Sequence, residues 1–257
     1  MLQCPTFRLP FHTSYAPSYG SGRRDTRTDC LPSRVTTMAA NDCLLCGDYH
    51  RDEEASGIAR FCGRDILSRA MLYQTTDYFL IPAPGSFTPG YLILAPTRHL
   101  LNFAQLDHFL LLEAHRLISG VRQVARRRGL QTIVAFEHGG WGVHRQGAGC
   151  VEHAHLHLVP SPNPLGLRQA LKSHYPERVA RDVAGLAEIV ADLPYVFLDI
   201  GPTAFVYETP MIPSQYVRQL LAAQWGLPEQ WDWRRYPFPK VVRQTIELFG
   251  TLEVELT

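Results

Sequence analysis

Apolar residues along the chain follow two spacings, which predict strands and helices in alternation. Short apolar runs separated by turns that contain Pro and Gly are typical of strands. These strands are expected at residues 78–81, 91–95, 132–136 and 151–159. Between the second and third strands, apolar side chains recur every three or four residues, which predicts a long amphipathic helix. Asn102 can cap this helix near residue 103, and a basic run before Gly129 suits its C-terminal end.

The C-terminal part of the chain is expected to add further helices and one pair of strands. The helices are expected at about 165–174, 177–191, 213–225 and 239–249, and the strands at 195–200 and 204–207. Strands and helices in this order fit an α+β architecture. The 257 residues suffice for one large domain, or for a smaller domain with extensions.

Residues 1–37 differ in composition from the rest of the chain. From Phe11 to Thr37 the sequence is rich in Ser, Thr, Gly, Pro and Arg, and it lacks the apolar core of a secretory signal. We expect a disordered tail, or sequence upstream of a natural start at Met38. An Arg- and Ser-rich transit peptide is a third interpretation.

Charge and composition narrow the class of protein. The 25 Lys and Arg residues nearly balance the 24 Asp and Glu residues, which argues against a nucleic-acid or anionic-membrane partner. Hydrophobic residues make up 46% of the chain, enough for a sizeable core. No apolar run approaches the roughly 18 residues of a membrane span, and six scattered cysteines do not form a disulfide framework. The composition therefore predicts a soluble, cytoplasmic protein.

Three histidines alternate with apolar residues within the fourth predicted strand. On a strand, His153, His155 and His157 would share one face. A row of imidazoles makes a poor core because each ring brings two polar nitrogens that need partners. It suits chemistry, since imidazole can bind metal, attack as a nucleophile or move protons near neutral pH. The spacing of histidines along one strand fits a single three-histidine metal site poorly. A surface strand whose histidines have no functional role is the other interpretation.

The histidine segment resembles the signature of the histidine triad (HIT) superfamily, His-φ-His-φ-His-φ-φ, where φ is apolar. All seven positions match from His153 to Val159. The pair Cys43 and Cys46 stands where many members carry a CxxC motif, and residues 90–99 (GYLILAPTRH) are similar to the strand that precedes the long helix. The resemblance covers about residues 43–160 and implies an antiparallel sheet with a long helix. It divides the chain into a HIT domain at 38–164 and a C-terminal, mostly helical α/β extension at 165–257 that packs on it.

The resemblance implies a catalytic role for two of the histidines. In such enzymes the middle histidine, here His155, attacks the α-phosphorus of a nucleotide and forms a covalent nucleotidyl-histidine. Its other ring nitrogen must donate to a fixed backbone carbonyl, which we expect from the preceding strand. His157 would contact the phosphate or assist the leaving group. The backbone around Gly149 and Cys150 would face phosphate oxygens.

Structural zinc is the second implication. Cys43 and Cys46 have the spacing of a zinc knuckle, and a tetrahedral Cys2His2 site needs two imidazoles. In zinc-bearing relatives these come from the positions that match His99 and His153. His50 is a rival ligand because it lies close to the cysteines in sequence, whereas Cys62 is expected to be a small core residue.

Departures from the family pattern leave the substrate open. Gly149 and Cys150 stand where many nucleotide-hydrolysing members have Gln and Ser, and Ala83 stands where smaller members have an acid that binds ribose. The sequence has Glu137-His138-Gly139 where those members often have Asn. In the C-terminal part, Gln215 and Arg218 near a helix N-terminus could reach phosphate in place of the missing Gln. A surface helix with a paired Arg218 is the alternative.

Three functions remain compatible with the sequence. We expect a nucleotide hydrolase acting on a dinucleoside polyphosphate, a nucleoside phosphoramidate or a related conjugate. A nucleotidyltransferase of the same mechanism is the second, although His157 stands where the uridylyltransferase branch has Gln, which favours hydrolysis. A non-catalytic nucleotide-binding module is the third. HIT proteins commonly form homodimers through the long helix and the adjoining strand, a surface that the C-terminal extension could instead cover.

Overall fold

A computed structural model describes residues 43–140, 153–190, 193–208 and 212–250. The expectations for residues 1–37, and the placement of Gly149 and Cys150, lie outside the described residues. The described residues all belong to one compact unit, which spans Thr37–Thr257. None of their helices combines the length and the apolar character that a membrane span requires.

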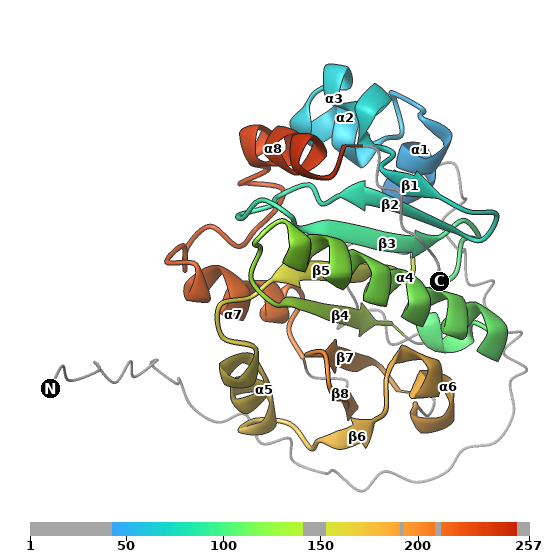
Figure 1. The fold of residues 1–257 in the computed structure, drawn as a ribbon, viewed down its shortest axis with the longest axis vertical. Coiled ribbons are helices and arrows are strands. Elements are labelled where there is room, and N and C mark those ends of the chain that lie inside the picture. The colour runs from blue at the N-terminus through green and yellow to red at the C-terminus, as the bar shows by residue number, and fades with distance from the viewer. Residues whose placement is uncertain (1–42, 141–152, 191–192, 209–211, 251–257) are drawn as a thin grey trace, which may run out of the picture. The chain divides into compact units, whose positions relative to one another are not determined.

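An eight-stranded sheet organises this unit, and every pair of neighbouring strands in it is antiparallel (Figure 1). In spatial order the strands are β1 (Tyr73–Gln74), β2 (Tyr78–Pro82), β3 (Leu92–Pro96), β5 (Leu156–Pro160), β4 (Ile133–Gly139), β7 (Tyr195–Asp199), β8 (Ala204–Glu208) and β6 (Arg178–Ala180). The central strands β2, β3 and β7 are buried at every position, because helices cover both faces of the sheet. The predicted α+β class and antiparallel sheet are confirmed.

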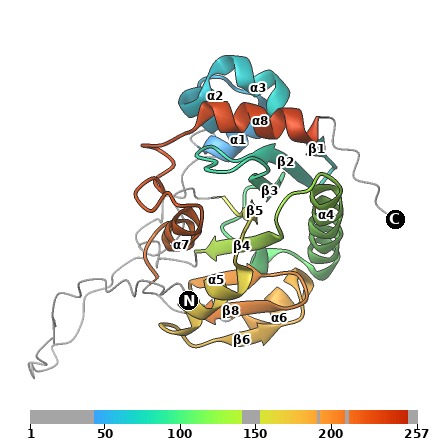
Figure 2. The same ribbon diagram turned by 60° about the vertical axis from the view of Figure 1, so that its left-hand side comes forward.

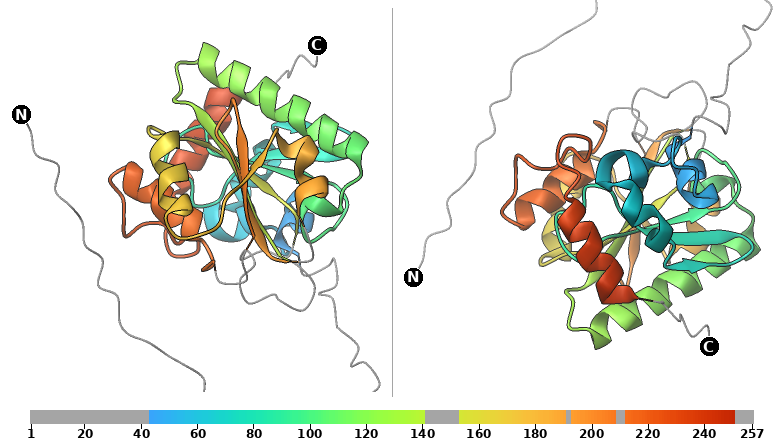
Figure 3. Two further views of the ribbon diagram at one scale, coloured as in Figure 1. Left: turned by 90° about the horizontal axis from the view of Figure 1, so that it is seen from below. Right: turned by 90° about the horizontal axis from the view of Figure 1, so that it is seen from above.

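Helices pack on both faces and at one end of the sheet. They are α1 (Leu44–His50), α2 (Gly57–Cys62), α3 (Arg64–Ala70), α4 (His108–Arg127), α5 (Pro164–Lys172), α6 (Leu186–Ile189), α7 (Tyr216–Gln224) and α8 (Pro239–Phe249), with 3-10 turns η2 (Phe103–Gln105) and η4 (Val183–Gly185). The long helix α4 runs along one face and α7 lies on the opposite side (Figure 2). The C-terminal helix α8 packs beside α2 and α3 near β2 (Figure 3).

The long helix begins later than the sequence indicates. Asp107, not Asn102, is its N-cap, and the Asp107 carboxylate accepts a hydrogen bond from the Leu110 backbone N–H at 3.0 Å. Asn102 is buried in extended conformation, and its side-chain amide donates to the Gly140 carbonyl at 2.5 Å. Both residue types cap helices well. The prediction for Asn102 was therefore wrong because its side chain is committed to a contact 38 residues away in sequence.

The region after residue 164 contributes strands to the sheet as well as helices. β7, β8 and β6 extend it beyond β4, and the predicted strand pair at 195–200 and 204–207 is confirmed as β7 and β8. The expected helix at 177–191 is wrong: the segment forms β6, η4 and the single turn α6. Val179 pairs with Phe205 of β8, and the Asp182 side chain accepts from the Ala184 N–H at 2.8 Å. The strand pairing and the Asp182 turn therefore prevent one continuous helix over residues 177–191.

The second edge of β4 is occupied within the chain itself. β4 pairs with β5 on one side and with β7 on the other, where Phe136 lies opposite Leu198. The strand beside the long helix, through which HIT proteins commonly pair, therefore has no free edge here, because β7 from the C-terminal part of the chain occupies it.

A buried carboxylate connects β4 to the turn before α4. Glu137 is 2% exposed, accepts from the Phe103 N–H at 3.0 Å, and accepts from the Tyr195 hydroxyl at 2.5 Å. Burial raises the pKa of Glu137 to about 8 from an ordinary 4.5, and these two hydrogen bonds oppose the rise. A pKa that folding raises gives stability that is complete below the unfolded value and is lost as pH rises through the folded value.

We therefore expect the stability of the wild type relative to Glu137→Gln to fall between pH 5 and pH 8. The melting temperature of the wild type minus that of the variant should fall by several degrees over this pH range, since each 1 kcal/mol corresponds to roughly 2–4 °C in a chain of this size. Thermal unfolding of both proteins at several pH values measures this, with the exposed Glu188→Gln as the control. A difference that stays constant from pH 5 to pH 8 would contradict the expectation.

Candidate metal site and histidine pocket

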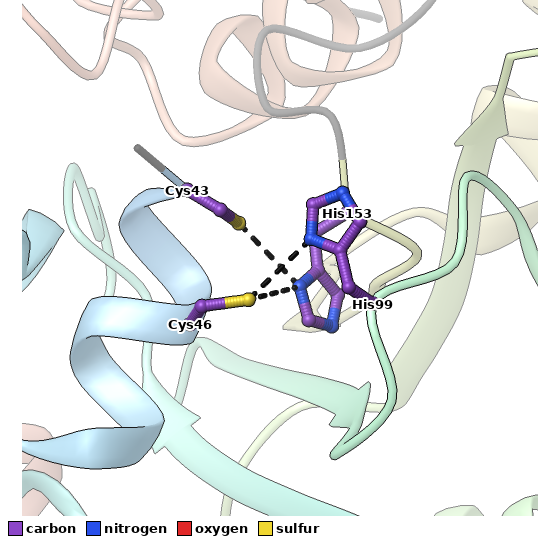
Figure 4. Close-up of side chains that lie close together, drawn as sticks. All are labelled: Cys43, Cys46, His99 and His153. Carbon is purple, nitrogen blue, oxygen red and sulfur yellow. Dashed lines mark hydrogen bonds between the residues drawn. The ribbon is translucent and has the colours of Figure 1, made fainter. Parts of the chain in front are cut away.

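Four side chains from three parts of the chain converge on one point (Figure 4). Cys43 and Cys46 lie at the start of α1, His99 follows β3, and His153 precedes β5. Their ligand atoms all lie within 4.8 Å of one another. The sequence predicted this set from motifs more than 100 residues apart.

The geometry of the cluster fits tetrahedral zinc. The Sγ atoms of Cys43 and Cys46 lie 3.5 and 3.4 Å from Nδ1 of His153, and Cys46 Sγ lies 3.4 Å from Nδ1 of His99. With Zn–S near 2.3 Å and Zn–N near 2.0–2.1 Å, a tetrahedral angle separates sulfur from nitrogen by about 3.6 Å. The three sulfur–nitrogen distances are thus close to those between zinc ligands.

A second contact prepares His153 for that role. Its Nε2 lies 2.9 Å from the Pro96 carbonyl, which can only accept, so Nε2 carries the proton and Nδ1 presents its lone pair to the cysteines. Interaction with the Cys46 thiol lowers the pKa of Cys43, which favours the thiolate that a metal requires. His50, the rival ligand, is exposed and outside the cluster. Cys62 is buried elsewhere, with Sγ 3.8 Å from the Pro237 carbonyl.

The three histidines do not share one strand face as expected. β5 begins at Leu156, so His157 lies in the strand while His153 and His155 precede it. The His153 ring therefore faces the cysteines, whereas the rings of His155 and His157 lie together with centroids 4.7 Å apart. The late start of the strand separates the metal ligand from the other two histidines.

His155 is fixed by the backbone of its own segment. Its Nδ1 lies 2.6 Å from the His153 carbonyl, so Nδ1 donates and Nε2 keeps a free lone pair. We had expected this carbonyl from the preceding strand, whereas it comes from two residues earlier in the same segment. Burial lowers the pKa of His155 to about 4, which keeps the imidazole neutral near pH 7.

His157 occupies the centre of the sheet. In the register it lies between Ile93 of β3 and Phe136 of β4. The Phe136 ring stacks on the imidazole at a centroid distance of 4.5 Å, and the Tyr91 hydroxyl lies 2.9 Å from Nδ1. Burial also lowers the pKa of His157 well below its ordinary value.

A pocket opens over these two histidines. Its empty space, with the open mouth included, is about 740 Å³. The wall is mostly apolar and includes Leu45, Ile93, Phe136 and Trp233, with α7 residues on the other side. The pocket therefore combines an apolar chamber with two imidazoles.

The first turn of α7 brings Gln215 and Arg218 to this pocket. Arg218 is buried, and its guanidinium reaches the Tyr91 hydroxyl, the Gly85 carbonyl and the Trp231 carbonyl, so it is not the surface residue of the alternative interpretation. Gln215 is partly exposed and accepts from the Trp233 N–H at 3.4 Å. No carboxylate among the described residues lies within 4.0 Å of Arg218.

Two residues had no role in the sequence interpretation: His138, which lines the pocket, and Tyr91, which is buried beside His157. His138 lies two residues after Phe136 on β4 and therefore shares the face of His157, which the strand alternation could have indicated. Burial lowers the pKa of His138 to about 4. Tyr91 carried no signal, because an aromatic residue beside an apolar run is typical of a core.

Comparison with known proteins finds no matching family model and no matching curated protein. Solved structures do match. A HIT family hydrolase from Clostridium thermocellum shares 18% identity at a TM-score of 0.32, covering 47% of this chain and 90% of that one. A Hit-like protein involved in cell-cycle regulation from Bartonella henselae shares 15% at 0.30, covering 38% and 75%. A hypothetical histidine triad nucleotide-binding protein from Sulfolobus tokodaii shares 16% at 0.32, covering 73% and 91%. These matches are to the family that the sequence motifs resemble.

We expect purified protein to contain about one zinc ion per chain, and Cys43→Ser and Cys46→Ser to lose it, because a hydroxyl is a poor replacement for a thiolate ligand. Elemental analysis after gel filtration measures the metal. Cys62→Ser and His50→Ala are matched controls that should keep the wild-type content. Retention of zinc by the Cys43→Ser/Cys46→Ser double variant would disprove the assignment.

Proposed function

We propose that the protein is a nucleotide hydrolase that works through a covalent nucleotidyl-histidine at His155. Its substrate would be a dinucleoside polyphosphate, a nucleoside phosphoramidate or a related conjugate. The observation that carries this proposal is the 2.6 Å contact from Nδ1 of His155 to the His153 carbonyl, which leaves a neutral Nε2 lone pair at the pocket.

The first step of the proposed reaction transfers the nucleotidyl group to the protein. Nε2 of His155 supplies the electron pair for a new N–P bond to the α-phosphorus, and the bond from phosphorus to the leaving group breaks. The leaving atom departs with the electron pair of that bond, and a hydrogen bond from a ring N–H of the neutral His157, whose ring centre is 4.7 Å from that of His155, stabilises its charge. Because the His155 Nδ1–H bond to the backbone is already in place, the developing positive charge on that imidazole is stabilised.

The second step returns the histidine to its starting state. Water attacks the phosphorus, the N–P bond breaks, and a nucleoside monophosphate leaves. The proton that water loses goes to solvent through the open pocket, and His155 leaves the phosphorus as the neutral imidazole it was at the start. The pair of histidines thus ends the cycle with the protons it had at the start.

The pocket has features that suit a phosphate. The positive end of α7 lines it, and the N-cap residue Gln215 has no side-chain hydrogen bond to the helix. The Tyr216 N–H donates to the Pro213 carbonyl at 3.1 Å, so the N–H groups of Val217 and Arg218 are the ones proposed to face an anion. The charge of Arg218 lies in the same wall. Gln215 is proposed to contact the phosphate through its amide, and the backbone of Gly149 and Cys150 to contribute further N–H groups.

The apolar part of the wall suits a nucleobase. Phe136 and Trp233 offer ring surface, and Leu45 of α1 closes the chamber on the metal side. Zinc would attach α1 to His153, two residues before the proposed nucleophile. We therefore assign the metal a structural role that keeps the Leu45 wall and the His155 segment together.

Hydrolysis is favoured over transfer by one feature of the site. His157 stands where the uridylyltransferase branch of the family that the sequence resembles has Gln. Transfer of the nucleotide to a phosphate or small-molecule acceptor is the alternative with the same covalent intermediate. A binding module that lacks catalysis would form no intermediate at all.

Intact-mass spectrometry after brief mixing tests the proposal directly. The wild type should gain the mass of a nucleoside monophosphate with at least one member of a panel of dinucleoside polyphosphates, nucleoside triphosphates, nucleotide sugars and adenosine phosphoramidate. His155→Ala should show no adduct and at least about a 1,000-fold loss of turnover, since it removes the nucleophile. His174→Ala, which alters an exposed histidine, should behave as the wild type.

Each alternative gives a different result in the same experiment. An adduct that an added acceptor discharges faster than water does would identify a transferase. An adduct that persists in His155→Ala would show that another residue is the nucleophile. If no compound gives an adduct or turnover, while thermal shift shows nucleotide binding, the protein is a binding module and the hydrolase proposal is wrong.

A further inference from the structure

We propose that Arg218 and Tyr91 form a relay that fixes the tautomer of His157, so that His157 presents an N–H to the pocket while His155 presents a lone pair. Arg218 is then a positioning residue that acts through Tyr91 and does not need to touch the substrate. The catalytic consequence rests on the proposed function, whereas the tautomer itself does not.

The direction of the hydrogen bonds in this relay is forced by the chemistry of its first member. A guanidinium has donors and no acceptor, so Nη1 of Arg218 donates to the Tyr91 hydroxyl at 2.8 Å. The Tyr91 hydroxyl must then direct its own hydrogen elsewhere. Among the described residues, the remaining partner of this hydroxyl is Nδ1 of His157 at 2.9 Å. Nδ1 therefore accepts, and the proton of the neutral ring is on Nε2.

The start of the relay is held in place by two backbone carbonyls. Nη2 of Arg218 donates to the Gly85 carbonyl at 2.8 Å, and Nε donates to the Trp231 carbonyl at 3.1 Å. Gly85 permits this close approach: its φ is +76°, and a Cβ there would lie 2.3 Å from Cβ of Trp233 and 2.9 Å from Nη2 of Arg218. The guanidinium is thus fixed in one orientation, with Nη1 toward Tyr91.

The end of the relay is equally constrained. Phe136 stacks on the His157 ring at an interplanar angle of 16°, while the Tyr91 ring meets it nearly edge-on at 69°. Rotation of the imidazole would break both contacts together with the hydrogen bond to Tyr91. Nε2 of His157 has no hydrogen-bond partner among the described residues, and His157 lines the pocket. The N–H is therefore available to a bound ligand.

The two neighbouring histidines consequently have opposite tautomers. His155 donates through Nδ1 to a carbonyl and keeps Nε2 unprotonated, whereas His157 accepts at Nδ1 and keeps Nε2 protonated. Opposite tautomers suit a nucleophile beside a hydrogen-bond donor, because His155 offers the lone pair that attacks and His157 offers the N–H that stabilises charge on the leaving atom. Arg218 comes from α7, so the C-terminal part of the chain would set the protonation pattern of a histidine in β5.

Long-range proton–nitrogen NMR correlation on the full-length protein tests the tautomer without any substrate. The ring signals of His157 are assigned by their absence in His157→Gln. In the wild type we expect Nδ1 to be unprotonated and Nε2 protonated. A wild-type His157 with the proton on Nδ1 overturns the proposal whatever the variants do.

Removal of the Tyr91 hydroxyl tests whether Tyr91 fixes the tautomer of His157. Tyr91→Phe keeps the buried ring and should give a mixture of His157 tautomers, while the His155 signals stay as in the wild type. Tyr78→Phe is the matched control, because it removes an equally buried hydroxyl whose hydrogen bond goes to the Leu110 carbonyl on the far side of the sheet. An unchanged tautomer in Tyr91→Phe overturns the relay.

Leaving-group dependence then separates this proposal from the hydrolase proposal. With a poor leaving group, on which negative charge is concentrated, Tyr91→Phe should slow adduct formation by about 10–100-fold, part of the gain usual for one positioned hydrogen-bond donor. With a nitrophenyl ester of the same nucleotide the loss should be less than about threefold, since nitrophenolate delocalises its charge and needs no donor. Equal losses on both substrates overturn the positioning role. A wild type without any adduct but with the expected tautomer refutes the hydrolase and leaves the tautomer assignment standing.

Discussion

The arrangement of the site depends on the position of His153, because its side chain and its backbone carbonyl make contacts in two different places. Its ring belongs to the cysteine cluster, and its carbonyl fixes His155 only 2.6 Å away. Both are possible because β5 does not begin until Leu156, so the backbone at residues 153–155 is free of the strict alternation of a strand. A strand that started earlier would direct all three imidazoles to one face and remove either the metal ligand or the orienting carbonyl. The residue that completes the cysteine–histidine cluster therefore also supplies the backbone carbonyl that orients the proposed nucleophile.

The C-terminal half of the chain completes this site from the opposite side. β7 occupies the free edge of β4, and α7 supplies the wall that faces the sheet. The pocket thus lies between segments that are distant in sequence, with Leu45 near the start of the described chain and Trp233 near its end. Such a site forms only when the whole unit has folded, which links the integrity of the pocket to the packing of both halves.

Local patterns in the sequence were sufficient for the parts of the site that depend on spacing. Cys43, Cys46, His99 and His153 converge as their motifs predicted, and the strands β2, β3, β4, β7 and β8 were found because apolar runs are buried on both sides. Features decided by distant contacts were missed. Asn102 and Asp107 are both competent caps, and only a contact to Gly140 decides between them. Likewise Tyr91 and Arg218 are 127 residues apart, and neither position carries a local sign of the other.

The electrostatic balance of the pocket is unusual and follows from the same geometry. Burial holds His138, His155 and His157 neutral, so their imidazoles do not add to the charge of Arg218. No carboxylate of the described residues pairs with that buried guanidinium, whose partners are the Tyr91 hydroxyl and two carbonyls. A buried charge that has only neutral partners retains part of its desolvation cost. An anion in the pocket would offset that cost, which would favour a negatively charged ligand over a neutral one of the same shape.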